Sequence, residues 1–222
     1  MSDSYLELAD WRRRVAQMWE AWRVQGGAGE DTLADATAAF RIAKDVLFRE
    51  HPQSPLPPPG RRGAFTGLGY WPYDPDWRMT VRLAPAPDLP PPESAATSGP
   101  IALPASGASA PSFRRVGTVD LAGPLAGQQL AVYWVEGYGG GLFLPFRDAT
   151  NGAETYAAGR YLLDTIKGAD AGGDPDTGEL VLDFNMAYFP SCAYDARWSC
   201  PLAPPENRLP VPVPAGERLA AS

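Results

Sequence analysis

Two amphipathic helices are predicted from the spacing of apolar residues in the first fifty positions. Over residues 4–25, and again from Asp31 or Thr32 to residue 50, large apolar side chains recur at steps of three and four, which is the period of one helix face. Gly26-Gly27 ends the first helix, and Pro52 ends the second because the residue before a proline is pushed out of the helical region. The apolar positions are Trp11, Val15, Met18 and Trp22 in the first helix and Leu33, Ala36, Phe40, Ala43 and Leu47 in the second.

From residue 65 the apolar period shifts toward two. Short runs rich in aromatic and β-branched residues are separated by turns that contain Gly, Pro or Asp, which is typical of strands. We therefore predict a mainly β (α+β) fold, an antiparallel β-barrel or sandwich with an N-terminal layer of two helices. The predicted strands are Phe65–Trp71, Trp77–Leu83, Phe113–Leu121, Gln129–Glu136, Leu142–Phe146, Thr155–Leu163 and Glu179–Phe184.

The chain divides into two expected units, a helical layer over residues 1–52 and a β-rich domain over residues 60–217. Residues 84–111 interrupt the second unit. They consist mainly of Pro, Ala, Ser and Gly, so they can contribute little to a core, and we expect a flexible insertion there.

The charge balance excludes several partners. A formal charge of -7 and a pI near 4.7 argue against nucleic acid, which binds to a basic face. No apolar run approaches the length that spans a membrane, so we expect no membrane association. The first ten residues carry acids and no apolar signal-peptide core, and we expect a cytoplasmic protein with reduced cysteines.

A block of charged residues in the last third of the chain suggests a site. Asn151-Gly152 predicts a tight turn, which would bring Arg147 and Asp148 close to the run that ends at Arg160. In a strand, Glu154, Tyr156 and Arg160 would share one face by alternation. Such groups, together with Asp183, could anchor an anionic ligand and supply an acid or base, or they could form a structural ion-pair network.

The cysteines and the single histidine limit the chemistry further. Cys192 and Cys200 are spaced more widely than the usual pair of zinc ligands, and His51 lies far away in the sequence, so we expect no metal and no cofactor. A catalytic triad could use only His51. Three interpretations of the cysteines stay open: both are inert thiols, Cys192 is reactive, or the two form a disulfide in an exported protein. No Gly-rich nucleotide-binding motif is present.

Aromatic residues fill the same last third of the chain. They could line a pocket or simply form the core. The Pro-rich run that follows Cys200 would lie over these aromatic residues as an extended arm. The polar residues after this run would then either satisfy backbone groups or face the same cleft as Asp183 and Asn185. The polar residues of this expected cleft are Asn185, Tyr194, Glu206 and Asn207.

The sequence also resembles a bacterial and archaeal family known as domain-of-unknown-function family 1684. Residues 41–69 are similar to it, as are four later motifs: Phe146 to Leu162, Asp183 to Tyr194, Cys200 to Leu209 and the terminal Ala215-Gly216-Glu217. Phe189 and Ala203 depart from the family pattern, which has Asn and Pro at those places. The resemblance implies a shared fold and no stated activity.

Our leading interpretation is a polar-aromatic cleft over residues 147–207 that binds a small polar or anionic molecule. Arg147 and Arg160 would anchor the ligand, and Asp183, Asn185, Tyr194 and Glu206 would orient it. The alternative is a non-catalytic structural or interaction module, in which the same residues lock the fold and Trp11, Trp19 or Trp22 contacts a partner. The Trp-rich first helix could also dock on a second copy and give a homodimer. In a third interpretation, Asp183 or Glu154 is a general base and Cys192 a nucleophile.

Overall fold

The computed structural model describes residues 4–27, 29–58, 63, 65–86, 101–102 and 112–220. Most of the predicted insertion over residues 84–111 lies outside this description. Among the described residues, no helix is both long and apolar enough to cross a membrane.

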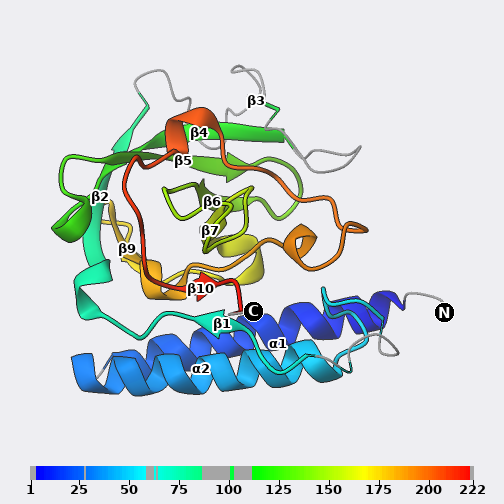
Figure 1. Cartoon of the computed structure of the whole chain (residues 1–222). Helices are drawn as coiled ribbons and strands as arrows, with labels where there is room; N and C mark the ends of the chain where they lie inside the picture. The colour runs from blue at the N-terminus through cyan, green and yellow to red at the C-terminus, as the bar shows by residue number, and fades with distance from the viewer. Residues whose placement is uncertain are drawn as a thin grey trace.

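Both predicted helices are confirmed. Helix α1 covers Tyr5–Gly26 and helix α2 covers Glu30–Glu50. His51 caps α2 in an extended conformation, as expected for the residue before Pro52. The two helices lie side by side beneath the β domain (Figure 1).

The apolar faces of the helices meet each other and the β domain. Trp19 and Trp22 are 3% and 2% exposed and pack in one cluster with Leu33, Ala169 and Met186. The indole N–H of Trp22 also donates a hydrogen bond to the hydroxyl of Thr37, 2.9 Å away. Two of the three tryptophans expected at a partner surface are therefore buried within the same chain.

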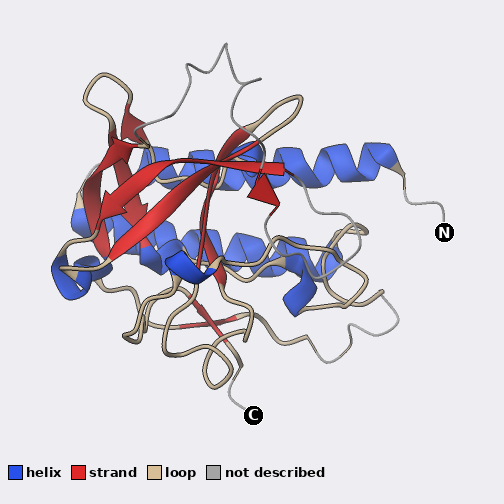
Figure 2. Cartoon of the chain, turned by 90° about the horizontal axis from the view of Figure 1, so that it is seen from above, coloured by secondary structure: helices blue, strands red, loops and turns tan. Residues whose placement is uncertain are grey.

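The predicted antiparallel sheet is confirmed and curls into a half-barrel, seen from two directions in Figures 1 and 2. Within the described residues it has the order β7-β6-β5-β4-β2-β9-β8, and β3 pairs with β4 outside this path. A separate small sheet joins β1, Gly69–Tyr70, to β10, Glu217–Arg218. The strands of the half-barrel are β2 Arg78–Pro85, β3 Ile101–Ala102, β4 Ser112–Asp120, β5 Gln129–Val135, β6 Gly141–Phe146, β7 Arg160–Asp164, β8 Gly173–Asp174 and β9 Glu179–Asp183.

The predicted strand Thr155–Leu163 is wrong at its start, because β7 begins at Arg160. The carbonyl of Thr150 accepts hydrogen bonds from the amides of residues 153, 154 and 155, which closes a tight turn. Gly159 has a φ of +102°, which also interrupts an extended strand. Glu154 and Tyr156 therefore do not share a strand face with Arg160.

The C-terminal segment closes the inside of the half-barrel. Leu209, Val213 and Ala215 are buried in the main core, against side chains of the sheet. The amide of Arg147 donates to the carbonyl of Asn207, and the amide of Leu209 donates to the carbonyl of Arg147, each at 2.8 Å. This segment continues into β10 and so brings Glu217 to the helical layer (Figure 1).

Candidate functional site

A cavity of about 360 Å³ lies between the helical layer and the β domain, and we call it the interlayer cavity. Its walls come from α1, α2, β1, β7, β10 and residues 185–201. Aromatic rings dominate both sides. The helices contribute Trp11, Trp19, Phe40 and Phe48, and the β domain contributes Tyr70, Tyr161, Tyr188, Phe189, Tyr194 and Trp198.

A buried ion pair between Lys44 and Glu217 joins the two layers at the cavity wall. Glu217 is 1% exposed, and its carboxylate accepts hydrogen bonds from the Lys44 ammonium, the Phe189 amide at 2.6 Å and the Tyr194 hydroxyl at 2.8 Å. The ammonium of Lys44 also lies 5.0 Å from the ring centroid of Tyr188. The carboxylate is therefore held by three donors of the protein itself.

Gly216 makes this placement of Glu217 possible. It has a φ of +78°, and a β-carbon there would lie 2.6 Å from the carbonyl oxygens of Phe184 and Ala187. Any side chain would clash with this backbone, so only glycine fits. The terminal Ala215-Gly216-Glu217 motif thus has a physical explanation, because its glycine permits the turn that places the Glu217 carboxylate beside Lys44.

Three buried donor atoms of cavity-lining residues lack an acceptor. Among the described residues, the Arg41 Nε, the Tyr70 hydroxyl and the Tyr188 hydroxyl have no hydrogen-bond partner within 3.5 Å. Buried polar groups of folded proteins are nearly always satisfied, so each such atom needs an explanation. Two of them have a carboxylate of the protein nearby, Glu217 beside Tyr70 and Asp164 beside Tyr188, although neither pair meets hydrogen-bond geometry. The Arg41 Nε is therefore the strongest of the three candidates for an acceptor that the protein does not supply.

The surroundings of these donors are well defined. The terminal nitrogens of Arg41 donate to the carbonyls of Trp71 at 2.9 Å and Asn185 at 3.3 Å, and its guanidinium lies 4.5 Å from the centroid of the Tyr70 ring. Burial, opposed by Tyr70 and the carboxylates of Glu217 and Asp183, lowers the pKa of Arg41. Its backbone partners fix the guanidinium and leave Nε for another acceptor.

Both tyrosine hydroxyls stay protonated. Burial, followed by the nearby Glu217 carboxylate, raises the pKa of Tyr70 well above its usual range. Burial and the carboxylate of Asp164 do the same to the pKa of Tyr188. Each hydroxyl therefore keeps a proton that it can donate to a ligand.

A second buried cation, Arg160, occupies an internal lock away from the cavity. Its guanidinium donates to the Asp148 carboxylate at 2.7 Å and to the carbonyls of Val213 at 2.8 Å, Ala215 and Glu217. The side chains of Arg160 and Asp148 are both 0% exposed. Burial lowers the pKa of Arg160, and Asp148 opposes that shift. These contacts tie the start of β7 to the C-terminal segment.

The other residues of the expected cleft do not lie together in the structure. Arg147 donates to the Ala157 carbonyl at 2.6 Å at the surface, and Glu154 is exposed. The remaining residues lie at several separate places. Asp183 pairs with Arg78 at 3.1 Å, Glu206 accepts from Tyr133 at 2.5 Å, Tyr156 donates to Cys192 at 3.7 Å, and Asn207 binds the backbone of Ala131 and Pro145.

Of the eleven residues proposed from the sequence, Asn185 and Tyr194 line the interlayer cavity. Sequence reasoning missed Arg41, Lys44 and Tyr70 because they precede the polar block. Two signals could have found part of the site: Lys44 is one of two lysines in the chain, and Glu217 ends a motif of the family resemblance.

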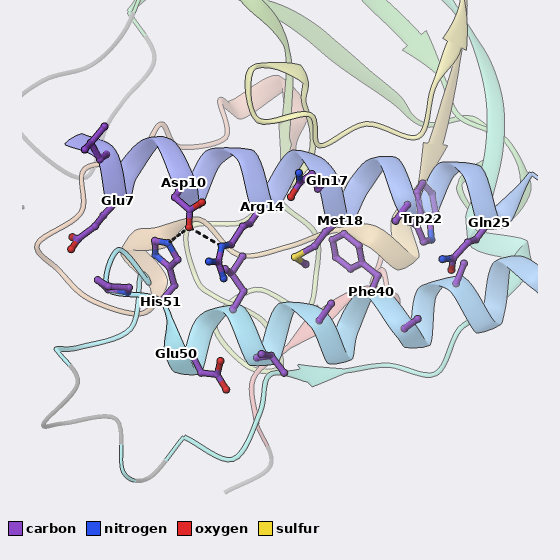
Figure 3. Close-up of a pocket in the computed structure, with 18 residues that line it drawn as sticks. Glu7, Asp10, Arg14, Gln17, Met18, Trp22, Gln25, Phe40, Glu50 and His51 are labelled. Atoms are coloured by element: carbon purple, nitrogen blue, oxygen red, sulfur yellow. Dashed lines mark hydrogen bonds and ion pairs between the residues drawn. The ribbon is translucent and has the colours of Figure 1, made fainter. Parts of the chain in front are cut away.

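A larger groove of about 910 Å³ runs between α1 and α2 (Figure 3). Three of its polar groups contact one another, because Asp10 accepts from Arg14 at 2.7 Å and lies 3.3 Å from the imidazole of His51. The three donors without an acceptor line the interlayer cavity and are not part of this groove. We therefore build the candidate site in the smaller cavity.

A comparison with protein families decides the classification. The model of a family described as "Protein of unknown function (DUF1684)" matches residues 63–218, which is more than half of the chain. The chain belongs to the DUF1684 family. The match includes Tyr70, Tyr188 and Glu217, whereas Arg41 and Lys44 precede it.

A solved structure agrees with this DUF1684 assignment. An uncharacterized protein of Haloarcula marismortui, determined in solution by NMR, is 34% identical and has a TM-score of 0.57. The similarity covers 82% of this chain and 91% of that chain. A comparison with curated proteins found no match.

Proposed function

We propose that this DUF1684 protein binds a small molecule in the interlayer cavity. The ligand would have an apolar, flat body and an anionic or other acceptor-bearing head. The observation that carries this proposal is the set of donors without an acceptor around that cavity, the Arg41 Nε and the hydroxyls of Tyr70 and Tyr188.

The size and lining of the cavity support the apolar part of the ligand. A volume of about 360 Å³ falls within the range of about 300–1,000 Å³ that is common for small-molecule sites. Aromatic rings on both walls offer large apolar surfaces for a flat ligand. The tyrosines and Arg41 then supply the few polar groups that would fix its orientation.

The charge of the lining supports an anionic head. Four cationic side chains line the cavity, Arg12, Arg41, Lys44 and Lys167, against one carboxylate, Glu217. Lys44 is paired with Glu217, and Lys167 is paired with Asp164 at 2.7 Å, so Arg12 and Arg41 supply the local excess in a chain with a net charge of -7. Charge-assisted hydrogen bonds to a carboxylate or phosphate are about twice as strong as neutral ones. An anion therefore gains most from these donors.

The internal lock favours a structural role for part of the polar block. Arg160 pairs with Asp148 and donates to the C-terminal backbone, as the interpretation of a structural module expects. We therefore assign ligand binding to the interlayer cavity and fold stability to the Arg160–Asp148 pair. Asn185 and Tyr194 remain in the proposed binding site, and Arg147 and Arg160 are left out of it.

The proposal can be tested with two matched probes, 2-naphthoate and 2-naphthamide, which share a ring system and differ in charge. Calorimetric titration should show binding of 2-naphthoate and about tenfold weaker binding of the amide, because the charged head gains more from the donors. Arg41→Lys should weaken 2-naphthoate binding, since lysine keeps a charge and lacks the Nε donor.

Leu6→Ala, in the groove between the helices, is the matched control and should leave binding unchanged. Equal affinity for both probes would contradict the anionic head. If Leu6→Ala weakens binding and Arg41→Lys does not, the probe binds in the larger groove between α1 and α2, which we call the outer groove. That result would overturn the proposal.

A further inference from the structure

Residues 190–201 form one wall of the interlayer cavity and contain both cysteines. The wall is held to neighbouring segments by side chains between the two cysteines. Tyr194 donates to Glu217 at 2.8 Å, the indole N–H of Trp198 donates to the Pro55 carbonyl at 3.1 Å, and Arg197 donates to the carbonyls of Ser54 and Leu56. The Tyr161 hydroxyl also donates to the Pro201 carbonyl at 2.6 Å, and the Tyr194 ring packs 5.3 Å from that of Phe48. All of these are side-chain contacts at one edge of the cavity, and none is a hydrogen bond between strands of the sheet.

The two thiols at the ends of this segment face each other. The amide of Cys192 donates to the sulfur of Cys200 at 3.3 Å, and no disulfide joins them in this structure. Hydrogen bonding to Cys192, followed by burial, raises the pKa of the Cys200 thiol. A disulfide needs β-carbons about 3.5–4.5 Å apart, and a sulfur this close to the backbone of its neighbour places the pair near that geometry.

The two sulfurs differ in access. Cys192 is half-buried and lies beside the Tyr156 hydroxyl, 3.7 Å from its sulfur, whereas Cys200 is 8% exposed. An oxidant from solvent therefore reaches Cys192 first. Cys200 is placed to attack the oxidised sulfur from inside.

We propose that Cys192 and Cys200 form a reversible dithiol–disulfide site that fastens residues 190–201 over the interlayer cavity. The oxidant is hydrogen peroxide. The Cys192 thiolate attacks one peroxide oxygen and breaks the O–O bond, which gives a sulfenic acid and a hydroxide that takes up the proton released by the thiol to become water. The Cys200 sulfur then attacks the sulfenic sulfur and forms the S–S bond, and the sulfenic oxygen leaves with the Cys200 proton as a second water. The two cysteines lose two electrons and two protons in total, and a dithiol reductant reverses the step.

The disulfide site stands on the geometry of the cysteines alone, whereas its effect on ligand exchange rests on the proposed function. A closed bond across the ends of residues 192–200 restricts the motions that open this wall. We therefore expect slower amide hydrogen exchange over residues 193–199 in the oxidised protein. We also expect slower entry and release of a ligand in the cavity.

The first experiment treats the full chain with hydrogen peroxide and measures its intact mass. The mass should fall by about 2 Da, the two hydrogens lost in one disulfide, and alkylation after unfolding should label neither cysteine until dithiothreitol is added. Cys200→Ser is the matched variant, in which the reaction should stop at a Cys192 sulfenic acid that dimedone captures. Sulfinic acid or an intermolecular disulfide as the main product of the wild type would overturn the site.

The second experiment compares reduced and oxidised protein by hydrogen exchange and by the exchange rate of 2-naphthoate. Protection of residues 193–199 in the oxidised form, with slower probe exchange, is the expected result. Unchanged protection would overturn the fastening of the wall even if the disulfide forms. If the probe binds neither form while the disulfide and the protection appear, the proposed function fails and the redox site stands.

Discussion

Two arginines show how the same side chain can serve two different purposes: Arg160, which is buried in the internal lock, and Arg41, which is half-buried at the interlayer cavity. Each has a buried Nε without an acceptor among the described residues. Arg160 faces the Asp148 carboxylate and three backbone carbonyls, and it does not line the cavity. Arg41 donates to two carbonyls and lines the cavity.

The comparison teaches that an unsatisfied donor does not by itself mark a binding site. The side chain of Arg41 lines a cavity that a ligand could enter, whereas Arg160 lines neither of the two cavities described above. Lys44 is intermediate: it lines the cavity, but its charge is already paired with Glu217. Substitutions at these places should therefore separate effects on stability from effects on binding.

The largest effect is expected in the lock. Arg160→Met leaves the Asp148 carboxylate buried without its cation, and breaking a buried pair in this way costs about 3–5 kcal/mol in the free energy of unfolding. Urea denaturation measures it. The double variant Arg160→Met with Asp148→Leu should recover part of the loss, because no charge then remains buried. A single variant with wild-type stability would contradict the lock.

A smaller loss is expected at the Lys44–Glu217 pair. Glu217→Gln keeps an oxygen that accepts from the Phe189 amide and the Tyr194 hydroxyl, but it removes the charge opposite Lys44. We expect a loss of about 2–3 kcal/mol, since hydrogen bonds to charged groups are the stronger ones. Thermal and urea unfolding of Glu217→Gln and Lys44→Met, alone and combined, give the coupling between them. Additive losses would show that the pair does not act as a unit.

The tyrosine hydroxyls distinguish binding from folding most clearly. Tyr70→Phe removes a buried hydroxyl without an acceptor, so the free energy of unfolding should stay within about 0.5 kcal/mol of the wild type or rise. The affinity for 2-naphthoate should fall about two- to tenfold. Tyr194→Phe is the matched control, because its hydroxyl donates to Glu217, and it should cost about 1 kcal/mol in stability. A clear stability loss in Tyr70→Phe would mean that the fold already uses that hydroxyl.

The smallest effect is expected at Asp183, whose partner Arg78 is 30% exposed. Burial raises the pKa of Asp183, although Asn185 and Arg78 oppose the shift. The folded state then binds more protons than the unfolded state just above the usual aspartate pKa, so this group makes stability fall as pH rises through that window. Urea unfolding should be measured for the wild type and Asp183→Asn from acidic to neutral pH. The free energy of unfolding of the wild type, relative to that of Asp183→Asn, should fall as the pH rises. A difference that grows in the opposite direction would contradict the raised pKa.

Local patterns predicted the fold well. Helices α1 and α2 follow from the 3.6-residue period and from Pro52, and most strands follow from alternation between turns. The run Thr155–Gly159 looked like a strand because its composition suits one. The tertiary setting decided otherwise, since three amides close on the Thr150 carbonyl and Gly159 adopts a positive φ.

The candidate site was harder to predict, because its parts come from both ends of the chain. Lys44 and Glu217 are 173 positions apart, and no local spacing reveals that they meet. The polar block over residues 147–207 was visible because its groups are dense in sequence, but the fold uses many of them for ion pairs and backbone contacts. Only the three-dimensional structure shows which donors are left facing a cavity.

The most direct test of the interlayer cavity is a heteronuclear NMR titration of the protein with 2-naphthoate. We predict that the largest chemical-shift changes will occur at Arg41, Tyr70 and residues 185–190, with small changes at Leu6 and Val46 on the outer groove. Shifts confined to the outer groove, or no shifts at millimolar probe, would contradict the account.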